Sequence, residues 1–453
     1  MTDRCTFADL PLEIVDLIFT HVRNESPQAV AIMQCSLVCH AWEALSLRHR
    51  FHKLRLGIHL PSDSFWSGGR TRYVDKFTKT DVFTRVHGLV RELLLQWGEA
   101  ASDRSVGPDF PAVAALFPGL HSLALLGVFD NRQIVPPPAA PQATPLLLDT
   151  LILREDFRRY SKARHAMQTL CAVLAHFSSV RELHLLGLGT LSAGPSVRVD
   201  DYTLPSVDVL VLRGFSLAPP VAALLQKLSG SKGLRTLDLF AFSGKPLNAV
   251  LRIAGALQPQ PAHICCSAAL VEKCKPVSLL FGFLHLKRDL PPAEPSPDFS
   301  SLHNMTRLTL AVEIVGSSTP AAAAAWVIVS HEAWLRTRDA LTSLPANCTL
   351  ACVDLWLTLF GRDEPDSGRD ALQMTLAEGH ARGDTGMVED VLLALVERRQ
   401  LEHVRVSLWR APPREYGVDA GYHLYAEDFP ATLFPRLDAL GVLRRYEPDY
   451  DHS

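Results

Sequence analysis

The chain has 453 residues, of which 47% are hydrophobic and 21% are charged, and its formal net charge is −3. This composition is typical of globular proteins rather than of disordered chains. The length allows one large domain or two to three ordinary ones. The small net charge argues against nucleic acid and anionic membranes as general partners. Nine cysteines without regular spacing argue against a disulfide framework.

Nothing in the sequence predicts a membrane span or a secretory signal. The longest purely apolar run, residues 321–329, is far shorter than the roughly 20 residues that a spanning helix needs. The first residues lack the basic and apolar regions of a signal peptide. We therefore expect an intracellular protein, cytoplasmic or nuclear, with reduced cysteines.

Residues 5–56 predict a small helical domain. Pro11 suits the first turn of a helix, where a missing N–H costs little, and the helix dipole favours Glu13 beside it. A second helix fits residues 27–47, and a break near residues 34–39 would give three short helices. The first helix has more apolar residues than one core-facing stripe needs. We expect a second apolar face that meets a partner; the alternative is a helical cap on a larger core.

A family resemblance favours the partner. The segment Leu10-Pro11-x-Glu13-Ile14, followed by Ile18-Phe19 and Val38-Cys39-x-x-Trp42 and closed by Phe51 and Leu54, resembles an F-box of the large basidiomycete-like fungal families. The resemblance covers about a tenth of the chain. It implies docking on the Skp-type adaptor of SCF cullin–RING ubiquitin ligases. The adaptor contacts that it implies are Leu10, Pro11, Ile14, Ile18, Phe19, Val38, Cys39 and Trp42. The alternative for any one of them, above all Phe19 and Trp42, is a place in the domain's own core.

After a polar connector at residues 57–84, one pattern recurs: an apolar residue, two others, an apolar residue, one other, and an apolar residue. Its central positions are 93, 123, 151, 183, 210 and 237, which lie 30, 28, 32, 27 and 27 residues apart. Such a period is typical of a leucine-rich-repeat-like solenoid, in which each unit adds a short strand and stacked units share one core. Helices are expected between the strands, at residues 110–117, 163–177, 221–228 and 247–257.

The predicted fold class is α/β, with a three-helix F-box followed by an irregular solenoid of this kind over residues 85–260. Residues 261–410 are predicted to continue it with larger insertions, and residues 411–453 to form a cap and a tail; a separate α/β domain is the alternative for the later part. Further strands are expected at residues 276–279, 305–310, 352–357 and 401–406, and long helices at residues 321–344 and 387–399.

Strand alternation places one face of the repeats away from the core. The residues on this outward face that we expect to contact a protein substrate are Leu94, Ile152, Arg154, His184, Val211, Arg213, Asp238 and Phe240. An apolar strip edged by charges suits a protein or a peptide. The alternative is that a terminal segment covers it.

No catalytic signature is present: the chain lacks Gly-x-Ser-x-Gly, His-Glu-x-x-His and a phosphate-binding loop. The Cys35, Cys39 and His40 group and the Cys265-Cys266 group lack the four-ligand spacing of a zinc site. We therefore predict no catalytic, cofactor or metal residues. The predicted function is a substrate-receptor subunit of an SCF-type ubiquitin ligase. Alternatives are a non-catalytic interaction scaffold and, less favoured, a small-ligand sensor.

Overall fold

The computed structural model describes residues 11–25, 30–58, 72–97, 110–127, 146–154, 166–190, 199–216, 219–230, 233–239, 244–267, 295–315, 320–348, 350–360, 381, 383–410, 422–423 and 429–445. The chain divides into two compact units, Met1–Pro205 and Ser206–Ser453. Both are mixed α/β with a largely parallel sheet, which confirms the predicted class at this level.

The first unit begins with three helices that contact one another, α1 (Leu12–Glu25), α2 (Val30–Cys35) and α3 (His40–Arg50). Helix α1 starts after Pro11, whose carbonyl accepts hydrogen bonds from the amides of Ile14 and Val15 at 3.0 and 3.2 Å. Helix α3 begins at His40, directly after Cys39, whose backbone is extended with φ −163°. Phe51 ends α3 and leads directly into the first strand, so the helices join the sheet without a long linker.

The sheet of the first unit has the order β2-β1-β3-β4-β5-β6 with parallel pairing throughout. Its strands are β1 (Lys53–Ile58), β2 (Arg72–Tyr73), β3 (Glu92–Trp97), β4 (Ser122–Leu126), β5 (Leu146–Arg154) and β6 (Phe177–Thr190). The helices of this part are α4 (Val74–Phe77), α5 (Asp81–Val86), α6 (Phe110–Ala115) and α7 (Ala166–Leu174), with short 3-10 turns at His87–Leu89 and Val199–Asp201.

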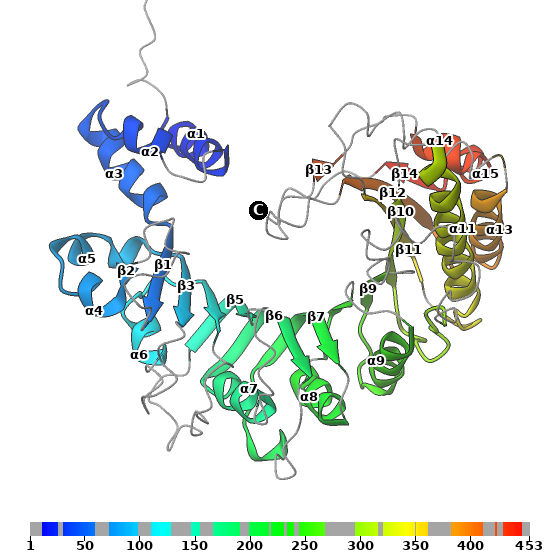
Figure 1. Ribbon diagram of the computed structural model, residues 1–453, viewed down its shortest axis with the longest axis horizontal. Coiled ribbons are helices and arrows are strands. Elements are labelled where there is room, and N and C mark those ends of the chain that lie inside the picture. The colour runs from blue at the N-terminus through cyan, green and yellow to red at the C-terminus, as the bar shows by residue number, and fades with distance from the viewer. Residues whose placement is uncertain are drawn as a thin grey trace, which may run out of the picture. The chain divides into compact units, whose positions relative to one another are not determined.

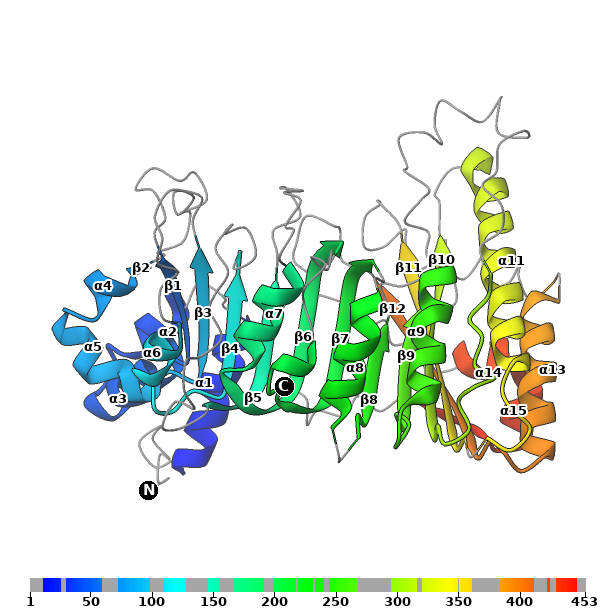
Figure 2. The ribbon, with the colours of Figure 1, turned by 90° about the horizontal axis from the view of Figure 1, so that it is seen from below.

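The second unit repeats the arrangement. Its sheet runs β7-β8-β9-β10-β11-β12 in parallel, β14 extends it in parallel beside β12, and β13 pairs with β12 antiparallel. The strands are β7 (Ser206–Ser216), β8 (Thr236–Leu239), β9 (His263–Ser267), β10 (Arg307–Val315), β11 (Cys352–Phe360), β12 (His403–Arg410), β13 (Tyr422–His423) and β14 (Leu443–Arg445). The helices are α8 (Pro219–Ser229), α9 (Gly244–Ala256), α11 (Pro320–Thr342), α13 (Asp384–Glu397), α14 (Phe429–Leu433) and α15 (Pro435–Ala439). Figures 1 and 2 show α9, α11 and α13 along one face of β9–β12.

The repeated apolar positions form the core. Within each unit the central residue of the pattern pairs with its counterpart on the next strand of the pattern, as Leu54 does with Leu93 and Leu93 with Leu123 in the first unit, and Leu237 with Ile264 and Ile264 with Leu308 in the second. These side chains are almost fully buried, and each contributes about 1.5–3 kcal/mol by leaving water. The six strands predicted around positions 93 to 237 are confirmed, as are those predicted at 305–310, 352–357 and 401–406.

A backbone motif recurs at the start of the strands. The carbonyl of His52 accepts from the amides of Arg91 and Glu92, both at 2.9 Å, and the carbonyl of Arg91 accepts from those of His121 and Ser122. In the second unit, the carbonyls of Ala262, Thr306 and Ala351 each accept from two consecutive amides of the next strand in the same way. One geometry therefore repeats despite the irregular lengths of the intervening segments.

Among the strands that were not predicted, β1 and β9 fit the pattern. Strand β1 reads Phe51-x-x-Leu54-x-Leu56, which we had placed at the end of the helical domain. Strand β9 reads Pro261-x-x-Ile264-x-Cys266, and Ile264 lies 27 residues after Leu237, so the short period continues one unit further than expected. Helix α4 lies within the predicted connector, and α5 begins within it. The strand predicted at residues 276–279 lies outside the described residues.

Candidate functional site

The three N-terminal helices enclose a very small core. Val15, Phe19 and Ile32 are buried, and Phe19 is only 1% exposed. The half-buried Trp42 packs edge-on against Phe19, with ring centroids 5.3 Å apart. For Phe19 the structure favours the alternative of a place in the domain's own core, because its aromatic side chain is the centre of this core. Much of the Trp42 side chain also packs against this core.

Polar contacts to Asp16 join α1 to α3; the shorter comes from His49, and Arg48 Nη1 lies 3.8 Å from Asp16 Oδ1. His49 Nε2 lies 2.9 Å from Asp16 Oδ1, and the His49 ring stacks on Phe19 with centroids 5.5 Å apart. Burial lowers the pKa of His49, and the hydrogen bond to Asp16 opposes this. His49 is thus held as a neutral donor to Asp16, and its buried Nδ1 has no hydrogen-bond partner within the described residues.

Large apolar side chains of the same helices face solvent. Ile14 and Leu17 on α1 are 43% and 64% exposed, and Leu37 and Val38 in the turn after α2 are 85% and 63% exposed. That turn is fixed by hydrogen bonds from the amides of Leu37 and Val38 to the carbonyls of Gln34 and Cys35 at 3.1 Å. We call these four residues the exposed apolar set.

The predicted adaptor residues divide accordingly. Pro11, Ile14, Val38 and Cys39 are exposed, Ile18 is half-buried, and Leu10 lies outside the described residues. Leu17 and Leu37 were missed. The helical spacing of Leu17 from Ile14, and the position of Leu37 beside Val38, were signals that could have found them.

The residues predicted on the outward face of the repeats differ in their exposure. Arg154 is exposed, and Leu94, Ile152, His184, Arg213 and Asp238 are half-buried. Val211 is only 4% exposed, so its side chain offers little surface for a contact in this fold. It is the register partner of Asp238, and Arg213 reaches diagonally toward Asp238 beside it, with Nη2 3.9 Å from Oδ2. Phe240 lies outside the described residues.

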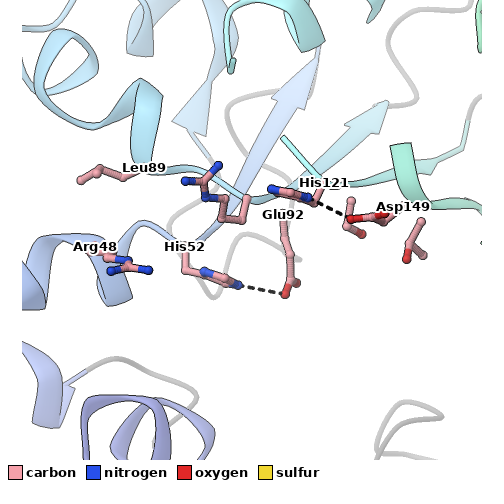
Figure 3. Close-up of a pocket in the computed structure, with 9 residues that line it drawn as sticks. Arg48, His52, Leu89, Glu92, His121 and Asp149 are labelled. Carbon is pink, nitrogen blue, oxygen red and sulfur yellow. Dashed lines mark hydrogen bonds and ion pairs between the residues drawn. The ribbon is translucent and has the colours of Figure 1, made fainter. Parts of the chain in front are cut away.

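A cavity of about 370 Å³ opens at the start of strands β1, β3, β4 and β5 of the first unit (Figure 3). His52 Nε2 lies 3.4 Å from Glu92 Oε1, and His121 Nδ1 lies 2.9 Å from Asp149 Oδ2. The hydrogen bond from His52, aided by Lys53, lowers the pKa of Glu92 to about 2. Each carboxylate thus already has a cationic or hydrogen-bonding partner from a neighbouring strand, so the pairs serve to join the strands.

The outward face of the second unit contains a buried polar network. Asp354 on β11 is 0% exposed and accepts from Arg307 Nε at 2.5 Å and Thr309 Oγ1 at 3.3 Å, both on β10. His263 on β9 lies 2.8 Å from Thr309 Oγ1 and 3.2 Å from Cys265 Sγ. Burial, followed by the charge of Arg307, lowers the pKa of His263 to about 4. The network links three adjacent strands and was not predicted.

The cysteine and histidine of this network are not arranged as an activated nucleophile. Burial raises the pKa of Cys265 well above its usual value, and burial together with Asp354 raises that of Cys352 to about 12. A reactive thiol needs a lowered pKa, as beside an imidazolium. At neutral pH the pKa of the Cys265 thiol is raised rather than lowered, and His263 is not an imidazolium. Cys265 and His263 therefore act here as hydrogen-bonding neighbours.

A scan against protein-family models found no match for the chain, and a search of curated proteins found none with significant similarity. Within the described ranges, no helix is both long and apolar enough to cross a membrane. The same part of the chain contains no group of three or more His, Cys, Asp or Glu side chains placed to hold a metal ion.

Proposed function

We propose that this chain is the substrate-receptor subunit of an SCF-type cullin–RING ubiquitin ligase, with its N-terminal helices acting as an F-box that binds a Skp-type adaptor. The observation that carries the proposal is the exposed apolar set, Ile14, Leu17, Leu37 and Val38. Large apolar side chains grouped in one small unit are characteristic of a surface that a partner covers. The sequence resemblance specifies which partner.

In this proposal the strands after the helices are a leucine-rich-repeat-like solenoid that holds a protein substrate. The parallel register of the repeated apolar residues and the recurring backbone motif at the strand starts support it. The protein lowers no chemical barrier itself. It raises the effective concentration of its substrate near the ubiquitin-transfer machinery, whose chemistry belongs to other subunits.

The test is binding of the full chain to a purified Skp-type adaptor. The double variant Leu17→Asp/Leu37→Asp places two charges on the exposed apolar set without altering Val15, Phe19 or Ile32. We expect its affinity for the adaptor to fall about 30-fold or more, because charges cannot replace apolar side chains in a desolvated interface.

The matched control is Leu147→Asp/Leu440→Asp, which changes two exposed leucines outside the helices. It should bind the adaptor as the wild type does. Failure of the wild type to bind, or equal loss in both double variants, would contradict the proposal. Adaptor binding without any ubiquitination of a captured protein would instead support the interaction scaffold. The cavity of Figure 3 is lined mainly by charged and polar residues, so it is not the enclosed apolar cavity that would favour a small-ligand sensor.

A further inference from the structure

Two arginines lie side by side on the outward face of the second unit. Arg405 on β12 is the register partner of Arg444 on β14, and the two strands are parallel neighbours. Like charges placed opposite each other on adjacent strands repel. The exposed Arg444 and the half-buried Arg405 are therefore placed at an electrostatic cost within the isolated fold.

The neighbouring carboxylate does not neutralise them. Asp354 is the register partner of Arg405 on its other side, but its oxygens are engaged by Arg307 and Thr309 from β10 and by Cys352 of its own strand. Within the described part of the chain, neither Arg405 nor Arg444 forms an ion pair. Within the described residues, two guanidinium groups thus remain available.

The surrounding side chains favour a peptide over nucleic acid. Half-buried Trp356 lies two residues beyond Asp354 on β11, and it pairs in register with Ser407, two residues beyond Arg405. Arginine and tryptophan beside each other are the residue types that dominate protein-binding hot spots. A continuous phosphate backbone would need a longer basic stripe, whereas this chain has a net charge of −3 and places Asp238 and Asp354 on the same face.

We propose that the outward face of β12 and β14, at Arg405 and Arg444, binds an acidic segment of the protein substrate, whose Asp or Glu carboxylates pair with the two guanidinium groups beside Trp356. Paired N–H donors of arginine match a carboxylate in two-point contacts. This inference rests on the proposed function in one respect only: that function makes the bound segment part of a ubiquitination substrate. In Figure 1 the two strands lie next to each other in the second unit.

The test uses the full chain and fluorescent octapeptides of glutamate, glutamine and lysine as probes. We expect glutamate octapeptide to bind more tightly than the other two, and its affinity to fall with added salt, since ionic contacts at a partly exposed site are screened. The variant Arg405→Glu/Arg444→Glu should lose about tenfold or more in affinity, because each charged hydrogen bond contributes strongly to binding. The milder Arg405→Gln/Arg444→Gln should also lose affinity, which separates a binding effect from misfolding caused by charge reversal.

The control with the same change in net charge is Arg252→Glu/Arg398→Glu, which alters exposed arginines of α9 and of the end of α13. It should bind glutamate octapeptide as the wild type does. Equal loss in both reversed variants, or no preference of the wild type for glutamate over glutamine, would overturn the site. Adaptor binding by Arg405→Glu/Arg444→Glu should be unchanged. Loss of adaptor binding in the wild type would contradict the proposed function alone, because the peptide assay does not depend on the adaptor.

Discussion

The N-terminal helices and the sheet of the second unit depart from ordinary burial in opposite directions. The helices expose large apolar side chains such as Leu17 and Leu37, while strands β10 and β11 bury the polar side chains of Thr309 and Asp354. Both departures are more informative than an ordinary apolar core, because each is costly unless something compensates for it. On β10 and β11 the compensation is internal, through hydrogen bonds. For the helices, the proposed function assigns it to a partner.

The largest effect is expected from removing the carboxylate at the centre of the network. Asp354→Ala should lower the free energy of unfolding of the second unit by about 4 kcal/mol, because Arg307 would remain partly buried without its partner. Urea denaturation followed by hydrogen exchange of β10–β12 measures this. Asp390→Ala, which breaks the exposed ion pair with Arg436, should change stability by less than about 1 kcal/mol. Similar losses of unfolding free energy in the two variants would contradict the expected difference between the buried and the exposed ion pair.

An ordinary core position gives the reference for this comparison. Leu95→Ala in β3 should cost about 3 kcal/mol, since the leucine is fully buried between neighbouring repeats and its loss leaves a cavity. Leu147→Ala, at an exposed position of β5, should cost less than about 0.5 kcal/mol. Urea denaturation of the two variants checks the difference. A small loss of stability in Leu95→Ala would mean that neighbouring strands do not share a close-packed core.

The network should also make stability depend on pH. The pKa of His263 in the folded protein is about 4, below its usual value of 6.5, so the fold favours the neutral imidazole. This stabilisation is complete above pH 6.5 and is lost as the pH falls toward 4. Between pH 7 and pH 5 we expect the second unit to lose about 2 kcal/mol. The variant His263→Gln should lack most of this pH dependence. If its stability changed with pH as that of the wild type does, His263 would not be the group responsible.

The repeated strands were predictable because burial dictates their pattern. Leu93, Leu123 and Leu151 recur at a spacing that stacked units require, and the structure places them in register. The same rule would have found β1 and β9 had Leu54 and Ile264 been tested against it. The network around Asp354 was not predictable in this way. Its residues lie 45 or more positions apart from their partners in neighbouring repeats, and only the register aligns them.

The helical domain shows a second limit. An apolar residue on a short amphipathic helix fits a core and an interface equally well, so the sequence alone did not separate Phe19 from Leu17. The decision depends on which side of α1 the other helices occupy. Contact with Trp42 and His49 places Phe19 inside, and Leu17 remains exposed.

The smallest expected effect completes the comparison. Leu17→Ala should change the stability of the helices by less than about 0.5 kcal/mol, because an exposed leucine loses little on truncation and alanine favours the helix. Phe19→Ala, two residues along the same helix, should cost about 3 kcal/mol by emptying the core. Hydrogen exchange of α1 and α3 measures both. A large cost at Leu17 would show that this side chain is already covered within the chain, and the exposed apolar set would then not be free for an adaptor.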